Sequence, residues 1–213
     1  MTKIFSSLEN VTQIFGRRLI FNNINFTFEQ GKIYGISGRN GSGKSTLSKI
    51  ILGLISPTRG KIIHKLDDKI IIPEKLHDHI GFVSPYLFLY DEFTAWENVE
   101  FFQKIRGLVP DTEKAKLLFE KFGIYDRRND LLKGYSSGMK QRMKFIFALI
   151  HEPGLLLFDE PTSNLDNAGK ETVYEIINSL GKTKTVIVAS NEETDLSYCN
   201  LLLDVEQFKK TDS

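Results

Sequence analysis

The stretch SGRNGSGKST, residues 37–46, holds three glycines within six positions and then runs into a lysine. Glycines at this spacing weaken a helix or a strand, so the segment must use its free backbone torsions and its exposed amides. The order Gly38, four residues, Gly43, Lys44, Ser45 fits a loop whose N–H groups surround phosphate and which opens a helix. A flexible glycine–serine turn is the structural alternative, and the strand and helix patterns on either side count against it.

Every residue of this loop is a candidate for nucleotide binding. The candidates are Gly38, Arg39, Asn40, Gly41, Ser42, Gly43, Lys44, Ser45 and Thr46. A helix expected over 44–54, with apolar residues that include Leu54, would direct the positive end of its dipole at the anion. Lys44 would reach the β and γ phosphates as a point charge. The Ser45 hydroxyl would ligate Mg²⁺, which prefers oxygen ligands.

Two carboxylates end an apolar run in LLLFDEP, residues 155–161. Such a run is typical of a buried parallel strand, and ligands collect at the carboxyl ends of the strands in parallel sheets. We expect Asp159 to stand beside the phosphate loop and hold Mg²⁺, through a water. Glu160 would orient or deprotonate the attacking water. The alternative is an acidic strand end that Pro161 turns, without chemistry.

A second set of small residues opens a helix at YSSGMKQR, residues 135–142. Ser136 and Gly138 stand where this helix begins, and Met143 and Ile146 mark its buried face. Such a start can bind an anion, but taken alone it is weak evidence, and a capped helix without a ligand is the favoured interpretation.

The remaining pattern shows which elements must position these groups. Residues 1–30 read as antiparallel strands with a turn near Gly16, and a further strand pair is expected around 61–73. From residue 86 to residue 150 the apolar residues recur with the period of a helix. Thr94 and Glu97 form a capping box before the apolar stripe Val99, Phe102, Ile105. From 154 onward strands and helices alternate.

The fold class predicted from this order is α/β, a parallel core interrupted by a helical lobe. The chain would form one domain, with residues 1–85 and 151–213 in the core and 86–150 in the lobe. Its 213 residues, 41% of them apolar, suffice for a sizeable core.

Composition bears on compartment and partners. A net charge of +1 supplies no broad cationic field for nucleic acid, so none is expected as a partner. The single cysteine, Cys199, cannot form an internal disulfide, which favours the cytosol and a packing role. No signal peptide or membrane span is expected. The two histidines of HDH, residues 77–79, lack further metal ligands nearby and are assigned to a solvated loop.

Taken together, these motifs resemble the nucleotide-binding domain of ABC transporters, and the resemblance covers nearly the whole chain. GRNGSGKS corresponds to Walker A, YSSGMKQR to the signature, LLLFDE to Walker B and SNLD, residues 163–166, to the D-loop. The resemblance implies a P-loop NTPase core with a mostly parallel sheet, an N-terminal antiparallel β subdomain and an inserted α-helical subdomain.

The resemblance also implies an activity and partners. The chain would bind ATP and Mg²⁺, hydrolyse ATP and energise a separate membrane permease from the cytoplasmic face. Two copies would form a head-to-tail dimer in which Ser136 and Gly138 serve the partner's γ-phosphate. Phe15 occupies the position of the aromatic residue that stacks on adenine, although a core role for its ring is the alternative.

The sequence departs from the family at two positions near the expected chemistry. Pro85 stands where relatives carry the Q-loop glutamine, and Asn191 stands where the switch histidine is expected as a catalytic group. The signature is also unusual, with Tyr135, Ser137 and Met139, and resembles that of ABC-2-type and haem-exporter-like ATPases. An export system is therefore favoured.

Three other functions stay open on the sequence. One is a soluble ABC ATPase that acts on DNA or ribosomes, which usually carries two cassettes or a long inserted arm. Another is a small-molecule P-loop kinase, against which the signature and D-loop argue. The third is a regulatory cassette that binds ATP and turns it over slowly, and the presence of Pro85 and Asn191 at these two positions is the evidence for it. The cargo and the permease lie outside this sequence.

Overall fold

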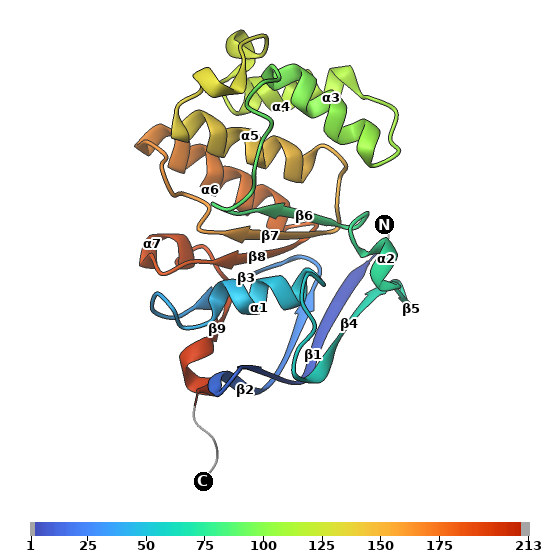
Figure 1. The fold of residues 1–213 in the computed structure, drawn as a ribbon, viewed down its shortest axis with the longest axis vertical. Helices are drawn as coiled ribbons and strands as arrows, with labels where there is room; N and C mark the ends of the chain where they lie inside the picture. Colours follow the sequence, from blue (N-terminus) through green and yellow to red (C-terminus); the bar gives the residue numbers. More distant parts are fainter. Residues whose placement is uncertain (1–2, 210–213) are drawn as a thin grey trace.

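A computed structural model describes residues 3–209 as two β-sheets with helices between and beside them (Figure 1). One sheet is antiparallel, in the order β2-β1-β4-β5. Its strands are β1 (Ile4–Phe15), β2 (Arg18–Glu29), β4 (Arg59–Leu66) and β5 (Lys69–Ile70). The predicted antiparallel start and its turn at Gly16, which has a φ of 59°, are confirmed. The second strand pair ends at Ile70, and Pro73 begins a short helix instead.

The other sheet is parallel throughout, in the order β6-β7-β8-β3-β9. Its strands are β3 (Lys32–Ser37), β6 (Ile80–Val83), β7 (Leu155–Asp159), β8 (Thr185–Ala189) and β9 (Leu201–Asp204). The helices are α1 (Lys44–Ile51), α2 (Pro73–Leu76), α3 (Ala95–Ile105), α4 (Thr112–Lys121), α5 (Ser137–Leu149), α6 (Asn167–Gly181) and α7 (Glu193–Leu196). This arrangement is the α/β P-loop NTPase fold that the sequence predicts. No helix within residues 3–209 has the length and apolar character that crossing a bilayer requires.

The central strand β7 is buried on both faces, which explains its continuous apolar run. Leu155 and Leu157 pack with α1 and the antiparallel sheet, while Leu156 and Phe158 pack toward α5 and α6. Alternate side chains of one strand therefore belong to two different cores. The strand ends at Asp159, between these two layers.

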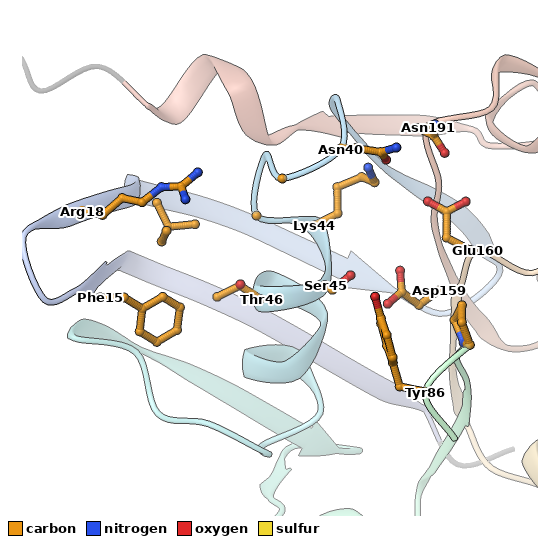
Figure 2. A pocket seen from close by; sticks show the side chains of 14 residues that line it. Phe15, Arg18, Asn40, Lys44, Ser45, Thr46, Tyr86, Asp159, Glu160 and Asn191 are labelled. Atoms are coloured by element: carbon orange, nitrogen blue, oxygen red, sulfur yellow. The ribbon is translucent and has the colours of Figure 1, made fainter. Parts of the chain in front are cut away.

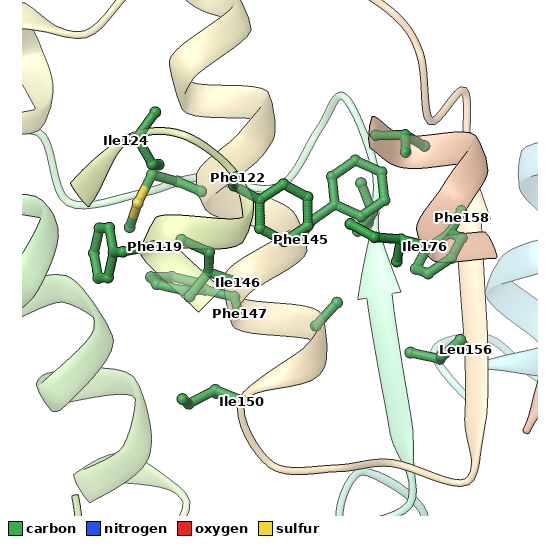
Figure 3. Close-up of a cluster of buried hydrophobic side chains, with 14 of the residues drawn as sticks. Phe119, Phe122, Ile124, Phe145, Ile146, Phe147, Ile150, Leu156, Phe158 and Ile176 are labelled. Atoms are coloured by element: carbon green, nitrogen blue, oxygen red, sulfur yellow. The ribbon is translucent and has the colours of Figure 1, made fainter. Parts of the chain in front are cut away.

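Aromatic side chains join the helical lobe to the sheet. Figure 3 shows Phe122, Phe145 and Phe158 in succession from the lobe to β7, and neighbouring ring centroids lie 5.5 and 5.2 Å apart. The predicted capping box of Thr94 and Glu97 is present at the start of α3. Phe119, Phe122 and Phe145 are buried, which confirms that these aromatic residues form core, whereas Phe88 is 93% exposed.

Two expected core residues are exposed instead. The helix predicted over 44–54 ends at Ile51, because Gly53 adopts a φ of 70° and the amide of Leu54 turns back to the carbonyl of Lys49. Leu54 is consequently 62% exposed. Ile105 is 63% exposed at the last residue of α3.

The helix α5 packs tightly against the edge strand β6. A Cβ on Gly81 would lie 2.2 Å from the carbonyl oxygen of Ala148, so only glycine permits this approach. The Lys144 ammonium donates to the carbonyls of Ser84 and Pro85, both at 3.0 Å. Burial lowers the pKa of Lys144. The loop that follows β6 is thereby tied to the middle of α5.

Acid is expected to destabilise the fold through a buried histidine of β4. His64 lies within 2.7 Å of the Ser6 hydroxyl, and burial lowers its pKa from 6.5 to about 4. Between these two pKa values the unfolded chain binds a proton that the folded chain does not. The free energy of unfolding should therefore fall as the pH drops from 6.5 toward 4, by roughly 1.4 kcal/mol per pH unit for this residue.

Urea midpoints at pH 7 and pH 5.5 measure this dependence. His64→Asn keeps a hydrogen-bonding group near Ser6 but does not titrate, so its midpoint should be lower at pH 7 and should change less with pH. An equal change in both proteins would show that His64 is protonated in the folded state. His151, whose pKa burial also lowers to about 4, remains in both proteins.

Candidate active site

The glycine-rich loop connects β3 to α1 in a conformation that requires its glycines. Gly38 and Gly43 have φ angles of 140° and 115°, which residues with a side chain rarely adopt. A Cβ on Gly43 would also lie 2.6 Å from Ile20 of β2, and one on Gly38 would lie 2.6 Å from the Ser42 hydroxyl. The backbone of the loop therefore packs closely against β2 and against Ser42, and the N-terminus of α1 follows directly.

The Lys44 ammonium lies on this loop. The residue is only 6% exposed, and its Nζ donates to the carbonyl of Gly38 at 2.8 Å and to that of Arg39 at 3.4 Å. A positive charge is therefore held among backbone groups at the start of α1. This is a suitable environment for the phosphates of a nucleotide.

Asp159, at the end of β7, faces the first turn of α1. Burial raises the pKa of its carboxyl group, while the Ser45 hydroxyl and the Lys44 charge act in the opposite direction. Its Oδ1 is buried and has no hydrogen-bond partner among the described residues. A buried acceptor without a donor is costly, and a cation would satisfy it. Asp159 and Ser45 therefore fit the oxygen ligands that Mg²⁺ requires.

Glu160 has an unusual backbone conformation. Its φ is 50°, and its amide donates to the carbonyl of Ala189 on the neighbouring strand at 2.8 Å. In the amide orientation that satisfies hydrogen bonding, Asn191 donates to both carboxylate oxygens of Glu160, at 3.2 and 3.1 Å. Burial raises the pKa of Glu160. A strained backbone that aims a half-buried carboxylate at a pocket is typical of a functional site.

These groups line one cavity of about 590 Å³ between the antiparallel sheet, α1 and the ends of β6, β7 and β8 (Figure 2). The candidate residues that line it are Phe15, Asn40, Gly41, Gly43, Lys44, Ser45, Thr46, Asp159, Glu160 and Asn191. Phe15 is 52% exposed, so its ring is available for stacking. Gly38 and Arg39 line a smaller neighbouring hollow, and Ser42 is buried beneath the loop.

Three further residues line the cavity that sequence reasoning did not select. Arg18 and Ile20 come from β2, and Tyr86 follows Pro85 in the loop after β6. In Figure 2 the Tyr86 ring points into the cavity toward Asp159 and Ser45. The sequence signal for Tyr86 was an aromatic residue next to Pro85, which stands where relatives carry a glutamine. The direction of the Tyr86 ring, however, depends on the turn that Ser84 forms with the amides of Tyr86 and Leu87.

Ser136 and Gly138 lie outside the cavity. Ser136 is an exposed N-cap whose hydroxyl accepts from the amide of Met139 at 3.2 Å. A Cβ on Gly138 would lie 2.9 Å from the carbonyl of Asn164 in the SNLD stretch. Within one chain, therefore, neither residue lines the cavity.

Comparison with known proteins gives a consistent result. Residues 21–163 match the protein family described as ABC transporter. The lipoprotein-releasing system ATP-binding protein LolD of Treponema denticola is 36% identical over 213 aligned positions, covering 93% of this chain and 91% of LolD. The ABC transporter ATP-binding protein NatA of Bacillus subtilis is 35% identical, covering 79% of this chain and 70% of NatA.

Among solved structures, the dimeric structure of MJ0796, a bacterial ABC transporter cassette, is similar with a TM-score of 0.82 and 26% identity. The similarity covers 94% of this chain and 95% of that one.

Proposed function

The chain belongs to the ABC transporter family, and on that premise we propose that it is an ATP-binding subunit that hydrolyses ATP to drive a separate membrane permease. The observation that carries the proposal is the convergence of Lys44, Asp159 and Glu160 on one cavity. Residues 1–213 act as one ATPase domain, held by the permease at the cytoplasmic face of the membrane. The signature residues Tyr135 and Met139 favour export as the direction of transport.

Each group of the cavity has a role in this proposal. The Phe15 ring packs against the base, and the amides of the loop with the Lys44 ammonium bind the phosphates. Ser45 and Asp159 hold Mg²⁺, which neutralises phosphate charge during transfer. Glu160 orients the attacking water and accepts its proton. Asn191, beside Glu160, supplies a neutral amide at the position where relatives carry a switch histidine that can be charged.

A second copy of the chain completes the site. Ser136 is the exposed N-cap of α5, Gly138 lies in the first turn of that helix, and neither residue lines the cavity of its own chain. In a head-to-tail dimer they contact the γ-phosphate bound by the partner, so ATP binding closes the dimer and hydrolysis opens it.

Phosphate release from ATP and Mg²⁺ by the purified protein tests the enzymatic part of the proposal. We expect turnover that saturates with ATP and that is abolished when Mg²⁺ is chelated. Co-purification with an integral membrane protein tests the transport part. Tight ATP binding without any phosphate release would identify a regulatory cassette instead.

The contact between Asn191 and Glu160 specifically favours slow turnover. Asn191 donates to the same carboxylate oxygens that must accept the proton of water. Pro85 meanwhile supplies neither a side-chain oxygen nor a backbone N–H to the cavity. Positioning and electrostatics supply most of the catalysis in phosphoryl transfer, so an incomplete set of donors reduces the rate.

Asn191→His is therefore expected to hydrolyse ATP faster than the wild type, by roughly 3- to 100-fold, because an imidazole can carry charge to the γ-phosphate. Turnover at saturating ATP is the measurement, with Glu192→Gln as a control for a change in the same segment that does not line the cavity. A wild type that is already fast, with no gain in the His variant, would show that other groups have replaced the switch.

A further inference from the structure

A buried carboxylate lies behind Glu160, outside the cavity. Asp195, on α7, is only 1% exposed, and both of its oxygens accept hydrogen bonds from hydroxyl groups. Oδ1 accepts from Thr162 at 2.9 Å and from Tyr174 at 2.8 Å. Oδ2 accepts from Ser190 at 2.7 Å. The three donors come from the segment after β7, from α6 and from the residue that follows β8, so Asp195 joins three parts of the chain around the site.

The three donors are themselves buried. Thr162, Tyr174 and Ser190 are 1%, 7% and 0% exposed. Burial and the hydrogen bond to Asp195 raise the pKa of Tyr174. Every oxygen of Asp195 thus has a donor that water cannot easily replace, which favours a single fixed arrangement.

The Ser190 hydroxyl stands between two carboxylates. Its oxygen lies 2.7 Å from Oδ2 of Asp195 and 3.4 Å from Oε2 of Glu160, and it also accepts from the amide of Glu192 at 3.1 Å. A hydroxyl has one proton to donate. The shorter distance assigns that proton to Asp195, and the Glu160 oxygen is left without a donor from Ser190.

We propose that Asp195 is a positioning residue for the reaction: by accepting the hydrogen bond of Ser190 it spares the Glu160 carboxylate a donor in addition to Asn191, so that Glu160 remains a stronger base toward water. The inference rests on the proposed function, because it assigns Glu160 the role of base. Asp195 itself does not line the cavity and contacts neither substrate nor metal in this scheme.

Asp195→Asn tests this assignment because a carboxamide offers one acceptor oxygen instead of two. An NH₂ group that faced Thr162 and Tyr174 would meet two hydroxyl donors, whereas an NH₂ group that faced Ser190 would meet only one. The amide nitrogen should therefore face Ser190. The Ser190 hydroxyl then donates to Glu160, the next acceptor, and this hydrogen bond lowers the basicity of the Glu160 carboxylate.

We expect Asp195→Asn to lower kcat about tenfold while KM and the affinity for a fluorescent ATP analogue change by less than about twofold. Removing the hydroxyl removes the unwanted donor, so Asp195→Asn combined with Ser190→Ala should recover kcat to within about threefold of the wild type. Ser190→Ala alone should also stay within about threefold.

Tyr174→Phe is the matched control. It removes one hydrogen bond from the far side of the same carboxylate and leaves Ser190 unchanged, so thermal stability should fall while kcat is retained. A role of Asp195 in stability alone predicts instead that kcat follows stability in both variants.

The results separate the alternatives. A normal kcat in Asp195→Asn overturns the inference, and so does a double variant as slow as Asp195→Asn. Should Asp195→Asn not fold, Ser190→Ala still decides: a loss of tenfold or more in a stable protein would show that the Ser190 proton serves Glu160. Absence of phosphate release by the wild type would overturn the proposed function, and this inference with it.

Discussion

Glu160→Gln is expected to bind ATP as tightly as the wild type and to hydrolyse it roughly 100- to 10,000-fold more slowly. A carboxamide has nearly the shape of a carboxylate, so the cavity and its phosphate contacts should persist. It cannot accept the proton of the attacking water. Glu160 adopts a φ of 50° and points into the cavity, and Gln at this position keeps the same backbone.

Single-turnover phosphate release and equilibrium ATP binding measure the two halves of this prediction. Glu193→Gln is the control, since it makes the same change at an exposed carboxylate on α7. A Gln variant with unchanged turnover would show that another group activates water. One that failed to bind ATP would show that Glu160 contributes to the binding site itself.

The same variant should accumulate a closed dimer with ATP and Mg²⁺, because ATP that is not hydrolysed continues to link the two copies. Light scattering with and without ATP gives the mass in solution. Adding Ser136→Arg, which enlarges an exposed N-cap, should return the protein to a monomer without changing its ATP affinity in dilute solution. A Glu160→Gln protein that stays monomeric at high ATP would contradict the head-to-tail arrangement.

Lys44→Ala is expected to weaken ATP binding by about one to two orders of magnitude, because a charge-assisted contact to phosphate contributes roughly 1.5–3 kcal/mol. The loss has a second source in this structure. The Lys44 ammonium also donates to the carbonyls of Gly38 and Arg39, so alanine removes two bonds that fix the loop.

Calorimetric titration with ATP measures the change. Lys49→Ala removes the same charge from the exposed side of α1 and serves as the control, with little expected effect. Equal affinity of the wild type and the Lys44 variant would show that the loop is not the nucleotide site.

The sequence predicts the local parts of this site well, because the relevant chemistry is encoded over a few consecutive residues. The glycine spacing before Lys44 requires a particular backbone, and the apolar run before Asp159 requires a buried strand. The structure brings both segments to one cavity. Parallel strands place their carboxyl ends at one edge, which is why this convergence could be expected from the sequence alone.

Contacts between distant segments could not be predicted in the same way. Asp195 is bonded to Thr162 and Tyr174, which lie 33 and 21 residues away along the chain. Its position in the sequence, in a polar stretch after β8, suggests an exposed residue. The direction of the Tyr86 ring and the donation of Asn191 to Glu160 likewise depend on how separate loops pack.

The close packing of α5 against β6 couples this helix to the loop that follows β6. Because the backbone of Gly81 touches Ala148 and Lys144 holds the carbonyls of Ser84 and Pro85, the rim of the cavity at Pro85 cannot shift without carrying α5. The helix has 13 residues and is about 20 Å long, and Ser136 caps its far end. We therefore expect a displacement of the rim at Pro85 to be accompanied by a displacement of the surface around Ser136, and the reverse.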